Sequence, residues 1–478
     1  MNRLNVILLL SLLVIGFFIR LYKFSEPLAD WHSFRQSDTA AVSQIFVDEG
    51  YNLLYPKYYD ISNVQSGFDN PNGYRFVEFP IYNFFHAFLY KTIGIFSFNE
   101  WGRMINILAS LVTAFVVFSL LRRYIGLAAG YAGLCAYLFL PFSIFYSRVI
   151  LPDVMMTSAI FLGIYFFDKY LEPYKERRLS LLYYLLSLLF TSLSFLLKPF
   201  ALFFIIPFVY LAYDRYGLKM LIKWQLYLFG IVTLAPLIAW RNWISQFPEG
   251  IPVSDWLFNG NNIRFRPSFF RWILFERITK LILGYFGVLF LLSSLFILKS
   301  KKSFLFIAFG LSSILYLLVI ATGNVQHDYY QIIIIPTICM FVGIGIDMIY
   351  KFLIRRINHN WAFVIIIAIF TFSFYFSWVQ IKDYFNINDR GMVMAGEKAN
   401  EILPKDAVVI APYDGSTVFL NTIKRRGWPV FQQDIEELIL EGAQYLVIAN
   451  PTPNDFSGFG TQYKVVDSSK DYLILQLK

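Results

Sequence analysis

The sequence predicts a polytopic α-helical membrane protein, with about 11 transmembrane helices followed by a small C-terminal α/β extracytoplasmic domain. Two observations predict this fold class. Long apolar segments recur through the first 381 residues, and the short connections between them alternate between basic and non-basic. The composition agrees, since 57% of the residues are hydrophobic and 15% are charged. Repeated apolar runs of this kind are typical of membrane spans.

The first span is expected to stay attached to the chain. The segment MNRLNVILLLSLLVIGFF has the basic and apolar parts of a signal peptide, but RLYKFSEP follows without a small-residue cleavage site. Further spans are expected wherever about 20 mostly apolar residues follow one another. The candidates are 5–22, 103–121, 126–146, 154–171, 180–197, 200–213, 224–240, 281–298, 303–320, 329–349 and 361–380.

Basic residues in alternate connections indicate the orientation of the chain. They gather at Arg3, Arg122, Arg123, Lys169, Lys175, Arg177, Arg178, Arg215, Lys219, Lys223, Lys299, Lys301, Lys302, Lys351, Arg355 and Arg356. We therefore expect a multi-pass protein of the cell inner (cytoplasmic) membrane, with its N-terminus in the cytoplasm. For residues 180–213, which Lys198 and Pro199 interrupt, a bent re-entrant hairpin is the alternative to two spans.

Three longer connections, 23–102, 241–280 and 321–330, are then expected on the outer face. The first is long for a loop. Its part FPIYNFFHAFLYKTIGIF (79–96) is apolar and aromatic but includes His86 and Lys91. We interpret it as a helix in the membrane interface, because counting it as a span would invert every later connection.

We interpret the tail as a separate domain, so the expected division is 1–381 for the transmembrane domain and 382–478 for the outer domain. AVVIAP (407–412), QYLVIAN (444–450) and YLILQL (472–477) predict strands, and DIEELILEGA predicts a helix. The tail carries 10 Lys and Arg against 13 Asp and Glu, so the net charge of +9 comes from the membrane region and does not indicate nucleic acid. The tail also lacks GxGxxG and P-loop motifs.

The ionisable residues expected on the outer face carry the candidate chemistry. For any one of them, a salt bridge or an interfacial anchor is the alternative interpretation. A carboxylate can act as general base, Arg and Lys can neutralise a phosphate leaving group, and a carboxylate beside His can hold a divalent cation. The set therefore indicates transfer chemistry on a phosphate-bearing lipid. Its members are Asp30, His32, Arg35, Asp38, Arg75, Glu78, His86, Arg103, Arg148, Asp153, Lys198, Arg241, His327 and Asp328.

Several of these segments together resemble a known family. They are the DWHSFRQSDT of the first outer loop, Gly94 with Gly102-Arg103 before the second span, SRVILPDVMM (147–156), HDYYQIIIIP (327–336), and RRGWPV and EGAQYLVIAN in the tail. In their order along the chain, and in the membrane face on which they are expected, these segments are similar to those of the GT-C fold glycosyltransferases of the protein-mannosyltransferase/ArnT-like family, glycosyltransferase family 39. The resemblance covers nearly the whole chain.

The resemblance implies an inverting hexosyl- or pentosyltransferase that moves a sugar from a polyprenyl-phosphate donor to an acceptor on the outer face. The acceptor is a lipid, a glycan or a protein. The family's catalytic base is an acidic residue of the first outer loop, here Asp30 or Asp38. Asp30 is preferred because it follows span one sooner, although the Asp-Glu or Asp-Asp pair usual in relatives is missing.

The remaining site residues are drawn from the residues expected on the outer face. Arg75, Arg103, Arg148 and Lys198 are candidates for the donor phosphate, and His327 and Tyr330 for the phosphate or sugar. His32, Arg35 and His86 join the substrate-binding set, and Asp153 would order an arginine or a metal. No cofactor is certain. A divalent metal, Mg, Mn or Zn, stays open, with Asp30 and Asp153 as its candidate ligands.

Two other functions fit a membrane protein with these charges. A transporter or flippase of lipid-linked glycans would show inverted repeats with paired broken spans, and only one broken pair is apparent. A polymerase or ligase of such glycans would need a large outer loop late in the chain, whereas the large loop here is the first. A scaffold would leave the outer polar residues unexplained.

The topology can be tested directly. Because eleven spans and the basic connections place the tail outside, a reporter that is active only in the cytoplasm should be silent when fused after Lys478. The same reporter fused after Arg123 should be active and serves as the control. A strong cytoplasmic signal from the Lys478 fusion would overturn this orientation.

Overall fold

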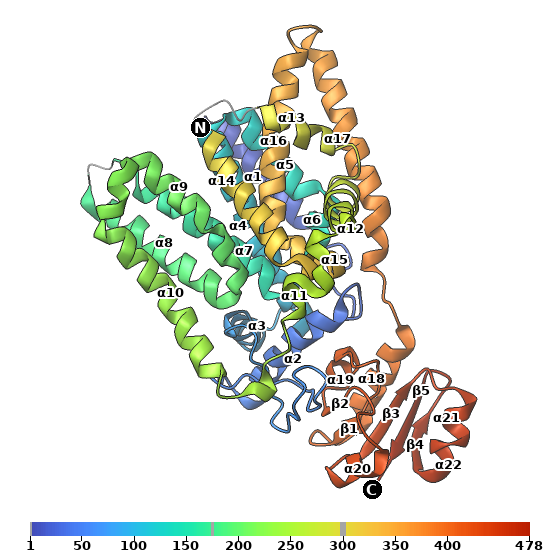
Figure 1. The fold of residues 1–478 in the computed structure, drawn as a ribbon. Helices are drawn as coiled ribbons and strands as arrows, with labels where there is room; N and C mark the ends of the chain where they lie inside the picture. The colour runs from blue at the N-terminus through green and yellow to red at the C-terminus, as the bar shows by residue number, and fades with distance from the viewer. Residues whose placement is uncertain (1, 174–175, 297–302) are drawn as a thin grey trace. The chain divides into compact units, whose positions relative to one another are not determined.

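The structure is a computed structural model that describes residues 2–173, 176–296 and 303–478 (Figure 1). The expected cytoplasmic residues Lys175, Lys299, Lys301 and Lys302 lie outside this range, as does the end of the expected span 281–298. The chain divides into two compact units. The helical unit comprises Met1–Phe24, Met104–Ala239 and Ser254–Asp383, and the mixed unit comprises Ser25–Arg103, Trp240–Val253 and Tyr384–Lys478.

The helical unit is built from apolar helices and short helical turns. Its elements are α1 (Arg3–Ile19), α4 (Phe98–Tyr124), α5 (Leu127–Phe139), α6 (Pro141–Tyr146), α7 (Pro152–Tyr170), α8 (Arg177–Leu197), η1 (Pro199–Phe204), α9 (Ile205–Tyr216), η2 (Gly217–Ile222), α10 (Trp224–Ile244), α11 (Trp256–Asn259), η4 (Gly260–Phe265), α12 (Pro267–Phe270), the π-helix η5 (Arg271–Ile282), α13 (Val288–Ser294), α14 (Phe304–Val319), α15 (Ala321–Gln326), η8 (Asp328–Ile334), α16 (Ile335–Leu353), α17 (His359–Ile381) and η9 (Lys382–Phe385).

Six helical segments of the described residues are long and apolar enough to cross a membrane. They are Phe98–Tyr124, Arg177–Leu197, Pro199–Ile222, Trp224–Ile244, Asp328–Leu353 and His359–Ile402, and three shorter apolar helices are Arg3–Ile19, Leu127–Phe139 and Phe304–Val319. Proline explains two breaks in the helices, one within the expected span 126–146 and one between 180–197 and 200–213. Pro141 separates α5 from α6, and the expected break at Lys198 and Pro199 is confirmed, because Lys198 is extended between α8 and η1.

Small residues let the apolar helices approach closely, as in other membrane proteins. A Cβ atom on Gly343 of α16 would lie 2.7 Å from the Ala129 carbonyl oxygen of α5, so this crossing requires glycine. A Cβ atom on Gly345, two residues further along α16, would similarly meet the Phe290 carbonyl of α13. Both sites would clash with any larger side chain.

Arg20 shows how the helical unit accommodates a charge that the sequence did not single out. Its side chain is fully buried just after α1. The guanidinium donates to the Gly16 and Leu138 carbonyl oxygens at 2.9 Å, to the Tyr137 carbonyl at 3.1 Å and to the Ser110 hydroxyl at 3.2 Å. The side chain thus ties the end of α1 to the end of α5, where helix carbonyls lack intrahelical partners.

The mixed unit combines the first outer segment with the C-terminal residues. Its elements are α2 (Ser33–Glu49), α3 (Ile81–Thr92), η3 (Pro248–Gly250), α18 (Arg390–Ile402), β1 (Val408–Ile410), α19 (Val418–Ile423), β2 (Arg426–Trp428), α20 (Ile435–Leu440), β3 (Tyr445–Ala449), α21 (Pro453–Ser457), α22 (Phe459–Gln462), β4 (Lys464–Ser468) and β5 (Tyr472–Gln476). The three strands and the helix predicted in the tail correspond to β1, β3, β5 and α20.

These strands form one five-stranded sheet in the order β2-β1-β3-β5-β4. β1 is parallel to β2 and β3, whereas β5 is antiparallel to β3 and β4. Alternate side chains face opposite sides, as the pleat requires. Ile410 and Leu446 join one apolar cluster, and Val409 and Val447 join the other.

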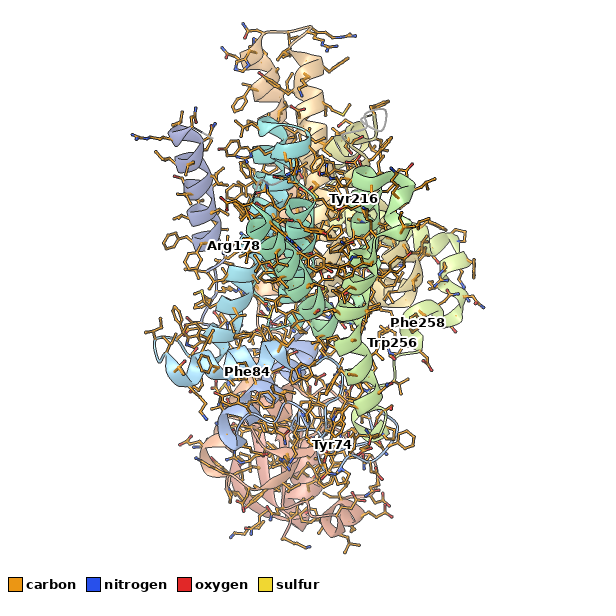
Figure 2. The ribbon with its side chains drawn as sticks, turned by 90° about the vertical axis from the view of Figure 1, so that its left-hand side faces the viewer. Tyr74, Phe84, Arg178, Tyr216, Trp256 and Phe258 are labelled. Atoms are coloured by element: carbon orange, nitrogen blue, oxygen red, sulfur yellow. The ribbon has the colours of Figure 1, made fainter. Side chains whose placement is uncertain are left out.

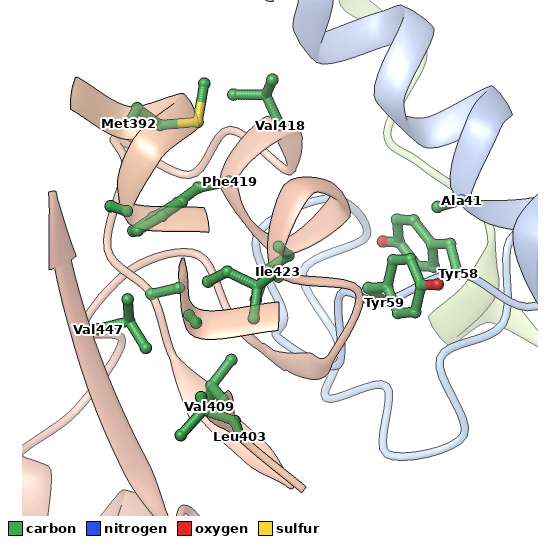
Figure 3. Packing of buried hydrophobic residues seen from close by; sticks show 14 of the residues in the cluster. Ala41, Tyr58, Tyr59, Met392, Leu403, Val409, Val418, Phe419, Ile423 and Val447 are labelled. Carbon is green, nitrogen blue, oxygen red and sulfur yellow. The ribbon is translucent and has the colours of Figure 1, made fainter. Parts of the chain in front are cut away.

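The second cluster includes residues of the first outer segment. Val42, Ile45 and Phe46 of α2 belong to the same buried core as Phe419 of α19 and the sheet. Figure 3 shows this packing, with Ala41, Tyr58 and Tyr59 from the outer segment. The outer segment is therefore part of a shared core and not a loop lying outside it.

Aromatic rings join the outer segment to residues 240–253 within the mixed unit. The ring of Tyr74, labelled in Figure 2, lies 5.9 Å from that of Tyr55 and 5.7 Å from that of Phe247. Phe76 stacks on Phe247 at 5.3 Å. A Cβ atom on Gly250 would collide with the Phe76 ring, so the close approach depends on glycine.

Asp60 lies where the outer segment meets the edge of the sheet. The Ile61 amide donates to the Gly427 carbonyl at 3.1 Å, and the Gly427 amide donates to the Tyr59 carbonyl at 2.9 Å. The Asp60 carboxylate is fully buried and accepts a 2.8 Å hydrogen bond from the Ser62 amide. Burial outweighs this bond and raises the pKa of Asp60 from 3.8 to about 6.

This raised pKa predicts a specific pH dependence of stability. Between pH 4 and 6 the folded protein binds the Asp60 proton more tightly than the unfolded chain, so this group's contribution to stability declines as pH rises, by about 3 kcal/mol in all. Asp60→Asn removes the titration. The thermal midpoint of Asp60→Asn relative to wild type should therefore be higher at pH 7.5 than at pH 4.5.

Asp69→Asn, at an exposed position of the same segment, is the matched control and should show no such pH-dependent difference. Comparing each variant with wild type at the same pH cancels the titration of all other groups. An Asp60→Asn difference that stays constant across this pH range would contradict the assignment.

Candidate active site

The candidate catalytic carboxylates lie at the start of α2 in the mixed unit. The preceding residues are held by main-chain hydrogen bonds, since the Trp31 amide donates to the Tyr384 carbonyl at 3.1 Å and the Asn388 amide to the Ala29 carbonyl at 2.9 Å. The Trp31 ring stacks on Tyr384 at 4.7 Å. His32 then adopts a left-handed conformation (φ 55°), which is uncommon for this residue type and turns the chain into α2.

Asp30 is buried in a polar setting. One carboxylate oxygen accepts a 2.8 Å hydrogen bond from the Gln36 amide, and the other lies 3.9 Å from the Arg103 guanidinium. Arg103 is itself fully buried and donates to the Glu26 carbonyl at 2.6 Å and the Pro27 carbonyl at 3.3 Å. Arg103, which was expected to bind the donor phosphate, therefore contacts the loop that carries Asp30.

Asp38, two turns into α2, is the centre of a larger charged group. Its Oδ2 lies 2.5 Å from the Arg75 guanidinium, and its Oδ1 accepts a 2.6 Å hydrogen bond from the Thr417 hydroxyl. Arg35 lies 3.8 Å away and pairs with Glu78 at 2.7 Å. Four of the expected outer-face residues, Arg35, Asp38, Arg75 and Glu78, therefore meet in one network.

Arg75 belongs to this network but uses only part of its hydrogen-bonding capacity there. Its side chain is 7% exposed and lies over the Tyr58 ring at 5.1 Å. Within the described residues, its Nε and Nη1 have no hydrogen-bond partner. Asp38 and the Tyr58 ring therefore stabilise the buried charge of Arg75.

A pocket of about 460 Å³ opens beside Asp38. All its lining residues belong to the mixed unit: the start of α2, the loop before α19, Gln65, Asn388 and Met392. Trp31, His32, Tyr413, Asp414 and Thr417 give the wall both aromatic and polar groups. Asp38 lines this pocket, whereas Asp30 does not.

His86 takes a different place from the one expected of a substrate ligand. It lies on α3, fully buried, and stacks on Phe98 at 4.2 Å. Its Nε2 contacts the Phe98 carbonyl oxygen at 2.7 Å. Burial lowers the pKa of His86 to about 4, so the ring is neutral near pH 7 and packs within the fold.

A second polar group lies in the helical unit and is centred on Lys198. The ammonium is 2.8 Å and 3.0 Å from the two carboxylate oxygens of Asp153. It also lies over the rings of Phe200, Tyr330 and Tyr329, at 5.1, 5.5 and 5.9 Å. Cation and aromatic faces attract each other, so these rings stabilise the charge in a buried place.

Further polar residues of the helical unit surround Asp328. Its Oδ1 accepts a 2.5 Å hydrogen bond from the Tyr146 hydroxyl, and its Oδ2 lies 3.8 Å from the Arg277 guanidinium. Neither Tyr146 nor Arg277 was among the expected site residues. Arg277 comes from the π-helix η5, a geometry that is frequent at functional sites and that no sequence pattern indicated.

The remaining expected residues of the helical unit are placed as follows. His327 stacks on Tyr329 at 5.5 Å and lies edge-on to Trp256 at 5.8 Å. Arg148 is buried, donates to the Tyr22 carbonyl at 2.5 Å and lies 6.0 Å from the Phe145 ring centre.

The candidate metal ligands, Asp30 and Asp153, both have partners among the neighbouring side chains. Both oxygens of Asp153 face the Lys198 ammonium, and Asp30 is held by Gln36 and Arg103. In the described part of the chain, no three His, Cys, Asp or Glu side chains are close enough together to hold a metal ion. These donor sets do not fit a divalent cation bound by protein ligands alone.

Residues 79–240 match the sequence profile of the family described as dolichyl-phosphate-mannose-protein mannosyltransferase. Among curated protein sequences, no match to this chain is found. The match covers α3, the residue pair Asp153 and Lys198, and several of the apolar helices.

Solved structures share the fold over nearly the whole chain. ArnT from Cupriavidus metallidurans bound to undecaprenyl phosphate is 13% identical, with a TM-score of 0.67 over 98% of this chain and 97% of ArnT. The Archaeoglobus fulgidus oligosaccharyltransferase in complex with Zn and sulfate is 12% identical, with a TM-score of 0.58 over 92% of this chain and 68% of that one.

The A. fulgidus oligosaccharyltransferase AglB, in complex with an inhibitory peptide and a dolichol-phosphate, is 11% identical, with a TM-score of 0.58 over 95% of this chain and 70% of AglB. At such identities the likeness is one of fold. Taken with the family match over residues 79–240 and the apolar helices, it shows that the chain is a multi-pass membrane protein with the fold of these transferases.

Proposed function

We propose that the protein transfers a sugar, with inversion, from a polyprenyl-phosphate donor to a hydroxyl or amine of a lipid, glycan or protein acceptor. The reaction would take place at the outer face of the inner membrane. The observation that carries this proposal is the buried carboxylate of Asp38 at the wall of a 460 Å³ pocket. The lipid phosphates bound to ArnT and AglB support the choice of donor.

The pocket favours Asp38 over Asp30 as the base, the reverse of the order suggested by the sequence. A general base must first reach the proton that it removes, and only then does its pKa matter. Asp38 lines the pocket, whereas Asp30 holds the turn before α2. Oδ1 of Asp38 accepts one hydrogen bond, from Thr417, whereas Oδ2 is paired with Arg75 and lies 3.8 Å from Arg35. Oδ1 therefore retains a lone pair for the acceptor proton.

The proposed step is a single displacement. Asp38 accepts the proton of the acceptor hydroxyl, and the acceptor oxygen bonds to the anomeric carbon from the face opposite the phosphate. The bond between that carbon and the phosphate oxygen breaks, and polyprenyl phosphate leaves with the electron pair. Arg75, which pairs with Asp38, holds that carboxylate in position.

Lys198 is our candidate for binding the donor phosphate. Negative charge grows on the leaving phosphate, and a fixed cation stabilises that charge most where water is excluded. Lys198 is buried and held by Asp153, which we assign as its positioning residue. No step of this proposal requires a metal.

The base assignment is tested with two conservative variants. Asp38→Asn keeps the size of the side chain but removes its basicity, so turnover should fall by roughly two orders of magnitude or more while donor binding persists. Asp30→Asn should lose much less. Turnover is measured with purified protein and a synthetic polyprenyl-phosphate sugar, and Asp69→Asn is the control.

An inactive Asp30→Asn beside an active Asp38→Asn would restore the order suggested by the sequence. Wild-type turnover in both variants would remove the general-base assignment altogether.

The phosphate assignment needs a variant that leaves no buried charge unpaired. Lys198→Gln alone would leave the Asp153 carboxylate buried without its cation, which could unfold the protein. Combining it with Asp153→Asn removes both charges, so a loss of phosphate binding can be distinguished from a loss of folding. The double variant should fold yet bind undecaprenyl phosphate about tenfold more weakly or worse, whereas Lys198→Arg should retain part of the affinity. Undiminished binding in the double variant would move the phosphate site to Arg148 or Arg277.

A further inference from the structure

A second, larger pocket lies in the mixed unit near the other end of α2. Its volume is about 1010 Å³, at the upper end of the roughly 300–1,000 Å³ usual for ligand sites. It is lined by the end of α2, Tyr59, the end of α18 with the loop after it, and the turn between α19 and β2. We refer to it as the Asp406 pocket. Asp48, on its wall, follows Asp38 by ten residues, or about 15 Å along the helix.

Tyr59 is one of the residues that line this pocket. The side chain is 6% exposed, and its ring belongs to the same buried core as Ile423 and Leu403 (Figure 3). Throughout the described ranges, no group forms a hydrogen bond with the Tyr59 hydroxyl. Buried polar groups in proteins are nearly always paired, so this hydroxyl points to a ligand with hydrogen-bonding groups.

The charges that line the Asp406 pocket cancel. Four carboxylates face four cations, and the eight residues are Asp48, Glu49, Glu401, Asp406, Lys405, Lys424, Arg425 and Arg426. Arg426 pairs with Glu49 at 2.8 Å. Arg425 is buried, and its donors are taken by Asn400 and by main-chain carbonyls, among them that of Leu403 at 2.7 Å. The pocket therefore favours neither an anionic nor a cationic ligand.

The edge of the sheet next to this pocket is closed to a peptide strand. β2 is an edge strand, but its outer side is already paired with the outer segment through Gly427, which bonds the main chain of Tyr59 and Ile61. An extended peptide would need free main-chain groups along such an edge. What remains is a roomy, polar, electrically neutral cavity with both donors and acceptors.

We propose that the Asp406 pocket binds a neutral oligosaccharide of several sugar residues. Sugar hydroxyls both donate and accept hydrogen bonds, so they match a wall that carries both carboxylates and cations, and they can pair with the Tyr59 hydroxyl. The site is distinct from the Asp38 pocket. Binding can be measured without transfer, so this proposal stands or falls independently of the proposed reaction.

The test uses the full chain in lipid nanodiscs, because detergents with sugar headgroups would compete. Neutral hexasaccharides of glucose, mannose or galactose are titrated at millimolar concentration and followed by saturation-transfer NMR. At least one should bind. Tyr59→Phe, which removes only the hydroxyl, and Asp406→Asn should each weaken that binding about fivefold or more.

Matched controls are Tyr463→Phe and Asp69→Asn, which change the same groups outside the pocket and should leave binding unchanged. A hexamer of galacturonic acid and a neutral hexapeptide serve as comparison ligands. The proposal is overturned if no neutral hexasaccharide binds, or if binding is insensitive to both pocket variants. It is also overturned if the acidic hexamer or the peptide is the ligand whose binding depends on Tyr59.

Discussion

The cost of burying a charge in an apolar protein governs the polar residues of this chain. An ionised side chain away from water is stable only when paired and hydrogen-bonded. Lys198 meets both oxygens of Asp153, Arg20 bonds three carbonyls and a hydroxyl, and Asp38 lies against Arg75. Partners of this kind hold a charged group in one position, which is what a group that must meet a substrate atom requires. The same interactions therefore stabilise the fold and prepare the chemistry.

Helix α2 links the chemistry to the core of the mixed unit. Val42 and Phe46 are buried with the helices and sheet of the C-terminal residues, while Asp38, one turn earlier than Val42, lines the proposed reaction pocket. Thr417, which donates to Asp38, immediately precedes α19 and the core residue Phe419. A loss of packing in this core would displace Asp38 and Thr417 together. This coupling explains why the long first segment folds with the C-terminal residues.

Local patterns could be read from the sequence, whereas distant pairings could not. Strands β1, β3 and β5 were predicted because short apolar runs between turn residues specify strands by themselves. The break at Lys198 was visible because Pro199 follows it. By contrast, Tyr146 meets Asp328 from 182 residues away, and Thr417 meets Asp38 from 379 residues away. Arg277 depends on a π-helix, and His86 resembled a ligand until its packing on Phe98 was seen. The carboxylates were identified by type, but their roles depend on tertiary neighbours.

The central claim is that a polyprenyl-phosphate sugar is the donor and that a carboxylate of the first outer segment is essential for its use. The most direct measurement is mass spectrometry of lipid extracts from cells that carry the gene, lack it, or carry it with Asp38→Asn and Asp30→Asn together. The account predicts that one polyprenyl-phosphate sugar accumulates in the cells that lack the gene and equally in those with the double variant. An unchanged pool of such lipids in both strains would contradict it, as would full use of the donor by the double variant.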